Sequence, residues 1–485
     1  MSELRPGLEP RQDEIAAMMA SATSFVTDFI GSLDTAPLNG LSSAGSATDH
    51  GIDADTAALL APPAEQPGEF GRLLDTFRGA AEQAADTAGP NTFAYFPGGG
   101  LFTSAVAELL ACTVNRFTAA SSMAPGLVAM EHGVIRWFAR QFGLPAAAGG
   151  LVTTGASTGA LSALLAARQE ILGDPPYHHR ATVYTTEHTH LSVAKAARIA
   201  GMSPDQVRLV PVDEGLRMDP EVAERMIVED RAAGRIPFLL VATAGTTNTG
   251  AVDRIDVLAD LARDRGLWLH VDAAYGGGFQ LTERGRAALA GIERADSIAL
   301  DPHKSMFFPY SSGVLLVRDE RLLHAAHSAD AAYLQDMDRE TPLPDYQDLG
   351  TEMSRGYRGL RLWLPLHLHG VAAFRAALDE KLDLARHVHA ELLTVPELEI
   401  LTPDLTVLNF RLRDGDDDAN RRLLEAIHAD RRVHLTSTRI HGRYTLRLCV
   451  LNHRTHRRHV DQVVSIVKDA VATVTATAPR ALVAL

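Results

Sequence analysis

The chain has 485 residues, with 46 Lys and Arg against 60 Asp and Glu, which gives a formal net charge of −14. Hydrophobic residues make up 46% and charged residues 22%, and this composition excludes disordered, collagen-like and low-complexity proteins. The acidic balance disfavours binding to nucleic acids and to membrane surfaces, because phosphate groups repel it. We therefore expect a globular protein of several structural units with no nucleic-acid and no membrane partner.

The first residues of the chain form an N-terminal arm in our interpretation. Residues 1–90 hold two helical stretches, about 14–32 and 69–87, and have too little apolar periodicity for a core of their own. We expect this helical arm to pack on a second subunit. The arm contains no apolar run of signal-peptide length, and no stretch of the chain reaches about 18 uninterrupted apolar residues.

The middle of the chain, residues 91–370, alternates short apolar runs with helical stretches. The expected strands are 181–184, 207–212, 238–242, 267–271, 297–300 and 313–317, and the expected helices include 161–172, 220–233 and 257–265. This alternation predicts a large α/β domain with a mostly parallel sheet between layers of helices. In such sheets ligands bind at the carboxyl ends of the strands.

The last stretch, residues 371–485, predicts a small α+β domain. The expected helices are 371–393, 419–428 and 454–474, and the expected strands are 406–412, 433–437 and 444–450. His453, His456 and His459 are spaced by three at a helix start and predict a solvated face, so we expect no metal site. The two cysteines, Cys112 and Cys449, lie in apolar contexts and are expected to be buried thiols, which fits a cytoplasmic protein.

The lysines are few, and one of them stands apart. Only four of the 46 basic residues are lysines: Lys195, Lys304, Lys381 and Lys468. Three lie in helical stretches among Arg, Asp or Glu, as solvated residues do. Lys304 follows the apolar strand 297–300, a place that suits a nucleophilic amine. A lysine that only extends from a strand end to solvent is the alternative.

Three further segments lie where strands should end. Residues 153–160 place small and hydroxyl side chains at a helix start, which suits a phosphate cradle or an ordinary helix cap. His188 and His190 follow the strand 181–184. They could bind a metal, have a structural role, act as an acid or base, or stack on a ring. Asp272 ends a buried strand and needs a cation or a donor there, unless it caps a turn. Together with Lys304 these segments predict a pyridoxal 5'-phosphate site, in which the lysine forms a Schiff base and the carboxylate pairs with the pyridine nitrogen.

The sequence resembles the group II pyridoxal-phosphate-dependent amino-acid decarboxylases, which include aromatic-amino-acid, glutamate and diaminobutyrate decarboxylases. The resemblance covers about residues 90–470 and rests on His-Val-Asp-Ala-Ala-Tyr at 270–275 and Asp-Pro-His-Lys at 301–304. The segments 244–250, 360–364 and 447–455 add to it. It implies the aspartate-aminotransferase fold (fold type I) and a homodimer with active sites at the subunit interface.

The resemblance also assigns roles to individual residues. Lys304, His190, Asp272 and Tyr333 would be catalytic, with Tyr333 on a mobile loop returning a proton to the α-carbon. The cofactor would be contacted by His190, Asp272 and Lys304 and also by Ala156, Ser157, Thr246, Ala274 and His303. The substrate would be contacted by Tyr95, Phe96, Gly98 and Arg358, although structural pairing is an equal reading for Arg355 and Arg358.

The implied reaction is decarboxylation of an L-amino acid through an external aldimine and a quinonoid. Several positions depart from the family pattern: Ala160 stands where an asparagine is usual, Asn91-Thr92 replaces a His-Pro or Asn-Pro pair, Gly98-Gly99-Gly100 widens the pocket wall, and Ser305 replaces a tryptophan. One alternative is oxidative deamination or β-elimination on an S-conjugated cysteine, as in lincosamide-type antibiotic biosynthesis. Another is a non-catalytic, decarboxylase-like regulator. Tyr333 favours protonation, and hence simple decarboxylation.

Overall fold

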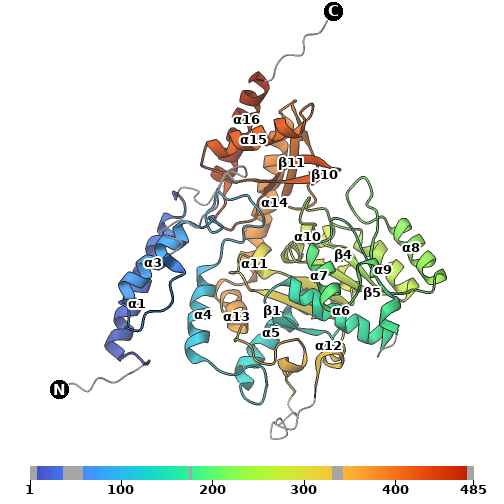
Figure 1. Ribbon diagram of the computed structural model, residues 1–485, viewed down its shortest axis with the longest axis horizontal. Helices are drawn as coiled ribbons and strands as arrows, with labels where there is room; N and C mark the ends of the chain where they lie inside the picture. The colour runs from blue at the N-terminus through green and yellow to red at the C-terminus, as the bar shows by residue number, and fades with distance from the viewer. Residues whose placement is uncertain (1–7, 37–57, 174–176, 330–341, 478–485) are drawn as a thin grey trace, which may run out of the picture.

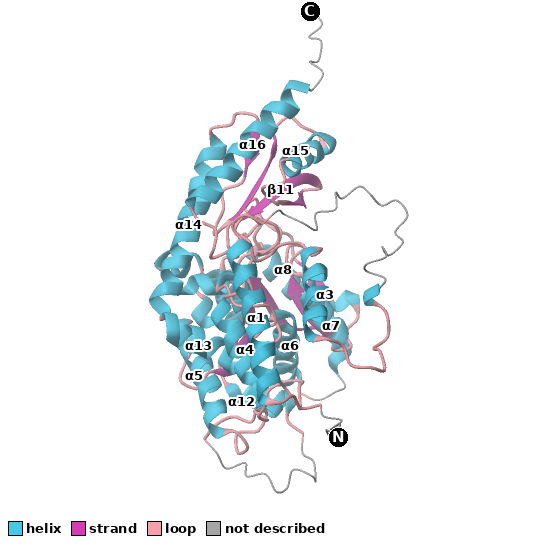
Figure 2. Ribbon diagram, turned by 90° about the vertical axis from the view of Figure 1, so that its left-hand side faces the viewer, coloured by secondary structure: helices cyan, strands magenta, loops and turns pink. Residues whose placement is uncertain are grey.

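A computed structural model describes residues 8–36, 58–173, 177–329 and 342–477. It consists of a large lobe built on one sheet, a smaller lobe built on a second sheet, and two N-terminal helices that lie beside the large lobe (Figure 1). Figure 2 shows the second sheet and its helices at one end of the molecule. The α/β fold predicted from the sequence is confirmed.

The large sheet has seven strands in the order β1-β7-β6-β5-β4-β2-β3. The strand β7 runs antiparallel to both of its neighbours, and the other four pairs are parallel. The bounds are β1 Gly149–Thr153, β2 Ala181–Thr185, β3 Val207–Leu209, β4 Ile236–Thr243, β5 Trp268–Ala273, β6 Ser297–Leu300 and β7 Gly313–Val317. Sequence analysis predicted six of these strands, while β1 was not predicted.

Helices cover both faces of this sheet, as expected for a buried parallel sheet. Alternate residues of β4 enter different cores: Leu239 and Val241 pack on one face, and Leu240 and Ala242 pack on the other. The first face is covered by α6 Ala156–Leu172, α7 Leu191–Ile199 and α12 Glu320–His327. The second is covered by α5 Pro125–Gln141, α8 Pro220–Ala232, α9 Ile255–Arg265, α13 Gly359–His369 and the first half of α14 Val371–Leu393.

The smaller lobe is built on a four-stranded antiparallel sheet in the order β10-β11-β9-β8. Its strands are β8 Leu398–Ile400, β9 Val407–Leu412, β10 Thr436–Ile440 and β11 Arg443–Cys449, and its helices are the second half of α14, α15 Asp417–Ala429 and α16 Arg457–Thr477. Phe93, which lies within the predicted large domain 91–370, is buried in this second core. The domain boundaries near residues 90 and 370 stay a prediction, because α14 contributes to both cores.

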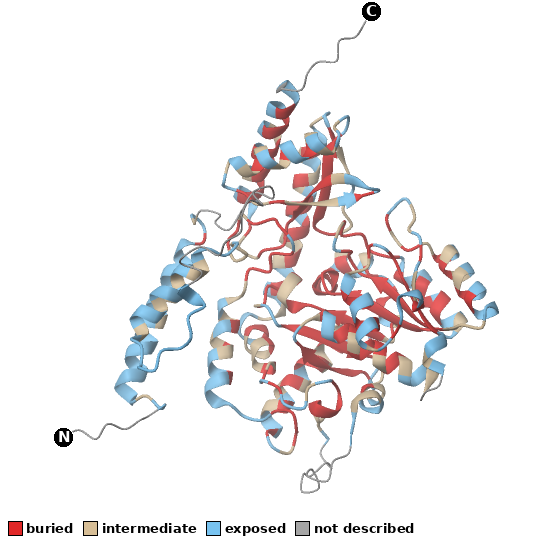
Figure 3. Cartoon of the chain, viewed as in Figure 1, coloured by how far each residue is buried: buried red, intermediate tan, exposed pale blue. Residues whose placement is uncertain are grey.

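The N-terminal helices are exposed over most of their length (Figure 3). No residue of α1 Gln12–Ser32 or α3 Phe70–Glu82 is buried. The two helices contact each other through Phe25 and Phe77, whose ring centroids lie 5.6 Å apart. Among the described residues, α1 is the one helix with the length and mean hydropathy of a membrane span, although Asp28 interrupts its apolar residues.

Three predicted environments are wrong. The side chain of Lys381 is fully buried and not solvated: its Nζ donates to the carbonyl of Thr455 and lies 2.8 Å from Glu380 Oε2. Burial lowers the pKa of Lys381. Cys112 is exposed, and only Cys449 is a buried thiol.

The third correction concerns the histidine triplet at the start of α16. His456 is exposed as predicted, but His459 is buried and lies 3.0 Å from Asp34 Oδ1. Burial also lowers the pKa of His453, to about 3. These side chains form part of the packing between the small lobe and the N-terminal segment. Among the described residues, no group of three or more His, Cys, Asp or Glu side chains is placed to hold a metal ion.

Candidate active site

Lys304 and Asp272 lie on neighbouring strands at one edge of the large sheet. Asp272 is the fifth residue of β5 and pairs in register with Ala299 of β6. Lys304 follows β6 on the short helix α11 Pro302–Ser305. The two strands are parallel, so their carboxyl ends meet at the same edge. A carboxylate and an amine 32 positions apart in the chain are thereby brought to one site.

Asp301 connects three groups of this site. Its buried carboxylate accepts the main-chain N–H of Ala156 at 2.7 Å through Oδ1. Its Oδ2 lies 3.1 Å from Lys304 Nζ and 3.6 Å from His303 Nε2. The ammonium of Lys304 therefore has an anionic partner, and the partner is tied to the start of α6. Sequence reasoning assigned no role to Asp301, although the motif 301–304 contained it.

His190 ends at the same edge, as the N-cap of α7. Its Nδ1 lies 2.8 Å from Ser192 Oγ and accepts the main-chain N–H of Ser192 at 3.3 Å. Because Nδ1 is an acceptor, the neutral ring carries its proton on Nε2. Burial lowers the pKa of His190, the negative charges of Asp272 and Asp301 oppose this shift, and the positive charge of Lys304 adds to it. The imidazole is thus close enough to Asp272 and Lys304 for both charges to act on it, and burial favours its neutral form.

The start of α6 offers small residues and exposed hydroxyl groups. Ser157 and Thr158 are exposed in its first turn, and Gly155 is its N-cap. The helix packs closely on the sheet at Gly159, where a Cβ would lie 3.4 Å from Ala299. His303 faces this region, and its Nδ1 donates to the carbonyl of Ser312 at 3.0 Å. The Thr158 hydroxyl donates to the carbonyl of Gly155 at 2.8 Å, and a helix N-terminus with exposed hydroxyl groups and an imidazole beside it fits a phosphate.

The two remaining predicted cofactor contacts, Ala274 and Thr246, follow the strands β5 and β4. Ala274 N–H donates to Asp272 Oδ1 at 3.1 Å, and the Ala274 carbonyl accepts the N–H of Asp301. Thr246 follows β4 and is buried, with its hydroxyl 2.8 Å from that of Thr249. Both residues therefore belong to the loops at the carboxyl edge of the sheet.

The predicted substrate wall crosses in front of Lys304. The ring of Phe96 lies 5.3 Å from Lys304 Nζ and stacks on Tyr275, with centroids 4.5 Å apart. Tyr95 has a left-handed backbone with φ of 52° and leaves its side chain 66% exposed. Gly98 is required where it stands, because a Cβ there would overlap the carbonyl oxygen of His303.

A buried arginine that sequence reasoning gave no role completes this wall. Arg447 of β11 places its guanidinium 4.7 Å from the Phe96 ring and donates to the carbonyls of Thr247 and Tyr95 at 2.9 and 2.7 Å. Its Nη2 is buried and has no hydrogen-bond partner among the described residues. An arginine within the apolar strand pattern Tyr444–Val450 was the signal that could have identified it.

Other predicted residues lie elsewhere or outside the described part. Arg358 forms a two-bond ion pair with Glu352, at 2.6 and 2.8 Å, so its charge is already engaged. Arg355 is buried in an ion pair with Glu131. Tyr333 lies outside the described residues.

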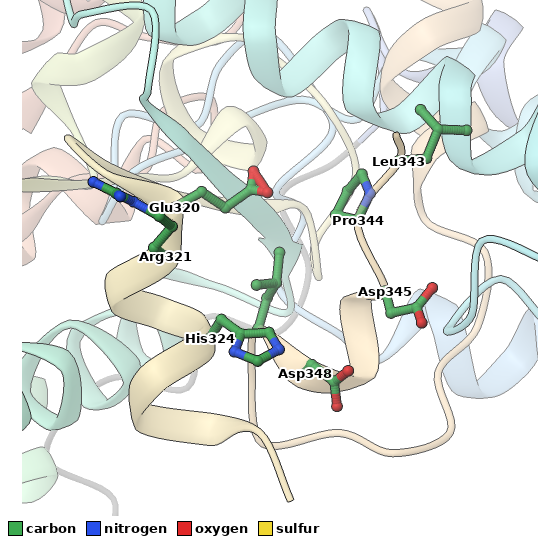
Figure 4. Close-up of a pocket in the computed structure, with 8 residues that line it drawn as sticks. Glu320, Arg321, His324, Leu343, Pro344, Asp345 and Asp348 are labelled. Atoms are coloured by element: carbon green, nitrogen blue, oxygen red, sulfur yellow. The ribbon is translucent and has the colours of Figure 1, made fainter. Parts of the chain in front are cut away.

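A surface pocket of about 300 Å³ lies away from this site. It is lined by α12 and by residues 343–349, including Glu320, His324, Asp345 and Asp348 (Figure 4). Glu320 follows the end of β7, and β7 runs antiparallel to β6. The pocket is therefore at the edge of the sheet opposite to Lys304, and we assign the chemistry to the Lys304 edge.

Comparison with known proteins decides the family. The pyridoxal-dependent decarboxylase conserved domain matches residues 62–413. The chain belongs to the pyridoxal-dependent decarboxylase family. It is 35% identical over 388 residues to an aromatic-L-amino-acid decarboxylase of Bacillus atrophaeus, with 78% of this chain and 80% of the relative covered. It is 33% identical over 400 residues to tryptophan decarboxylase TDC1 of Camptotheca acuminata, with the same coverage.

Solved structures agree with this decarboxylase family membership. The structure of Oryza sativa TDC with PLP and tryptamine superimposes with a TM-score of 0.90 at 26% identity, covering 96% of this chain and 99% of that chain. Catharanthus roseus tryptophan decarboxylase in complex with L-tryptophan gives 0.87 at 26% identity, covering 97% and 100%. The chain is an enzyme of the amino-acid decarboxylase family, and its cofactor is pyridoxal 5'-phosphate.

Proposed function

We propose that this decarboxylase acts on an L-amino acid with an aromatic side chain and releases carbon dioxide and the corresponding amine. The observation that carries the proposal is the convergence of Lys304, Asp272 and His190 beside an aromatic wall: both charged groups are close enough to shift the pKa of His190, and Phe96 faces Lys304 Nζ. Relatives named as aromatic-amino-acid and tryptophan decarboxylases support the substrate class.

Each residue would have a defined task in this reaction. The pyridoxal ring, when bound, withdraws electrons from the bond to the carboxylate that leaves. Lys304 would supply the amine that holds the cofactor, and Asp272 would supply a negative charge for the pyridine nitrogen. His190 would lie over the ring, and the Ser192 N–H at its Nδ1 leaves the proton of the neutral imidazole on Nε2.

The remaining contacts would hold the cofactor and the substrate in place. Ala156, Ser157 and His303 would bind the phosphate, with Thr246 and Ala274 beside the ring. Tyr95, Phe96 and Gly98 would form the wall against the substrate side chain. Arg358 is bound to Glu352, so its part in substrate binding would require that pair to open. Tyr333 would return a proton to the α-carbon.

A replacement of Lys304 tests the site. Lys304→Ala should remove the visible absorbance band of lysine-bound pyridoxal and the release of carbon dioxide, while Lys195→Ala, on an exposed part of α7, should keep both. Retention of the band in Lys304→Ala would refute the assignment of this amine. Presence of the band in the wild type would favour an enzyme over a non-catalytic regulator.

The fate of the substrate needs a separate assay, since relatives include a phenylacetaldehyde synthase of Arabidopsis thaliana at 29% identity. We propose to assay a panel of aromatic amino acids and S-conjugated cysteines for carbon dioxide, amine, ammonia and peroxide together. Amine equal to carbon dioxide supports simple decarboxylation. Ammonia and peroxide in proportion to carbon dioxide would reject it and favour oxidative deamination. Turnover of the S-conjugated cysteines alone would favour β-elimination and a role in antibiotic biosynthesis.

We infer that the enzyme is a cytoplasmic homodimer in which the N-terminal arm joins the subunits. Large apolar side chains are exposed along α1, α3 and α4 Phe102–Val114, including Phe29, Leu73, Phe77, Phe102 and Leu110. Exposed apolar side chains in this number are typical of a subunit interface. Leu110→Asp on α4 should yield a monomer in light scattering after size exclusion and lose activity, whereas a dimer with this substitution would contradict the inference.

A further inference from the structure

Residues 86–101, which include the substrate wall, are held in place by residues 452–455 of the small lobe. Residues 86–101 contain almost no regular secondary structure, so their main-chain carbonyls need partners from elsewhere. Asn452, fully buried, donates from Nδ2 to the carbonyls of Ala88 and Gly89 at 3.0 and 2.9 Å. Thr455 Oγ1 donates to the carbonyl of Pro90 at 2.6 Å.

Arg454 reaches the far end of the same segment. Its Nη1 donates to the carbonyl of Ala88 at 3.1 Å and to that of Gly99, and its Nη2 lies 3.4 Å from the carbonyl of Gly100. One guanidinium therefore ties the start of the segment to two consecutive carbonyls at its end. Only a planar fork of N–H donors can serve acceptors in this arrangement, so lysine would not replace arginine here.

On the side away from Arg454, residues 98–101 contact the segment that carries Lys304. The main-chain N–H of Leu101 donates to the carbonyl of Phe307 at 2.8 Å, and Gly98 packs directly on the carbonyl of His303. Residues 98–101 are thus enclosed between α11, which carries Lys304, and the guanidinium of Arg454. A displacement of residues 98–101 would change the volume available to a substrate next to the Lys304 amine.

The backbone conformation of the stretch makes it dependent on such support. Gly99 and Gly100 have φ of 79° and 63°, in the left-handed region. At Gly99 a Cβ would also lie 2.5 Å from Asn452 Oδ1 and 2.6 Å from His453 Nδ1, whereas at Gly100 it would meet nothing within 4 Å. Glycine gives this loop access to the conformation but also to others, so hydrogen bonds to its carbonyls have to select one.

We propose that Arg454 is a positioning residue that fixes residues 98–100 against the Lys304 segment and so sets the space for the substrate side chain. The proposal rests on the proposed function in taking the stretch 95–98 as the substrate wall. Arg454 touches neither Lys304 nor the predicted cofactor contacts, and it acts through the main chain of Gly99 and Gly100. The small lobe would therefore determine part of the specificity of a site that lies on the large lobe.

The test compares the holoenzymes of Arg454→Met and Arg457→Met. Arg457 starts α16, is 64% exposed and pairs with Asp461, so it is a matched control on the same surface. In Arg454→Met we expect main-chain hydrogen exchange in residues 98–101 to be about tenfold faster, which corresponds to about 1.4 kcal/mol. We expect KM for the preferred aromatic amino acid to rise about tenfold, with kcat within about threefold, since the hydrogen bonds to the carbonyls of Gly99 and Gly100, next to the wall, are lost.

Further readouts separate positioning from a general loss of folding. Arg454→Lys should behave as Arg454→Met does, and added guanidinium ion should restore KM in Arg454→Met but not in Arg454→Lys. Relative turnover of tryptophan and phenylalanine should change. Unchanged exchange at 98–101, or a loss confined to kcat, would overturn the proposal.

A second pair of variants applies if Arg454→Met does not fold. Gly99→Ala should raise KM more than Gly100→Ala does, because both carry left-handed strain but only Gly99 contacts Asn452 and His453. Equal effects of the two variants would overturn the proposal. If the wild type acts on no aromatic amino acid, the proposed substrate class fails, while the exchange comparison still decides the role of Arg454.

Discussion

The buried pair of Arg355 and Glu131 allows one prediction to be worked through. The two side chains are 2% and 0% exposed, and the guanidinium lies 4.5 Å from the ring of Tyr346. Glu131 is on α5, and Gly359 at the start of α13 packs against it. Arg355 is therefore enclosed by protein, and Arg355→Met should leave a carboxylate in the core with no cation beside it.

The expected cost follows from that burial. Removal of one partner of a buried ion pair costs about 3–5 kcal/mol, because the remaining charge stays desolvated. Unfolding entropy is about 2.1 cal/mol/K per residue, so about 280 residues that unfold together give about 0.6 kcal/mol/K. A loss of about 4 kcal/mol then lowers the unfolding midpoint by about 7 °C.

The assay is a double-mutant cycle followed by thermal unfolding of the holoenzyme. Arg355→Met and Glu131→Leu should each be strongly destabilising, and the double variant should recover most of the loss, because neither charge remains unpaired. A midpoint in Arg355→Met within about 1 °C of the wild type, together with a raised KM, would refute the structural role and restore Arg355 as a substrate ligand. Additive losses in the double variant would also contradict the reasoning.

Three further predictions concern pH, the arm and the wall. Burial lowers the pKa of His270 to about 4, below the ordinary value of about 6.5, so the unfolded chain binds the proton more readily and stability should fall as the pH drops from about 6.5 to about 4. His270→Phe should make this fall shallower, as measured by unfolding midpoints across that range. Asp34 accepts two hydrogen bonds from Arg458 at 2.8 Å and lies 3.0 Å from His459 Nε2, and these contacts lower its pKa, so Asp34→Asn should speed hydrogen exchange in α1 at pH 7. Gly98→Ala should lower kcat/KM more than about tenfold, because its Cβ would displace the wall from the carbonyl of His303.

Each of these predictions has a matched control or a contrary outcome. A pH slope in His270→Phe as steep as in the wild type would show that other groups cause the acid sensitivity. Equal exchange in α1 with and without the Asp34 carboxylate would mean that the arm is held by its apolar contacts alone. Gly133→Ala on α5, where a Cβ meets nothing within 4 Å, should keep full activity, and normal activity in Gly98→Ala would contradict the close packing at that residue.

Local patterns in the sequence predicted six of the seven strands of the large sheet and the cofactor of the site. Helix 371–393 was predicted at its observed ends, because its apolar residues repeat at helical spacing and Gly370 precedes it. Lys304 and Asp272 were identified because a charged residue directly after an apolar strand is costly unless it has a task. The strand β1 was missed, since its five residues Gly-Gly-Leu-Val-Thr give too short an apolar run to recognise.

The tertiary structure decided what each polar side chain meets. Lys381 carries charged neighbours in sequence and resembles a solvated lysine, yet α14 turns it toward Thr455, 74 positions away. Arg447 and Arg454 gain their roles from carbonyls more than 190 positions distant. A sequence shows which residue types lie on one face of a helix or strand, because the face is set by the residue repeat of that element. It does not show which distant face packs there, because burial and pairing depend on contacts that only the complete fold creates.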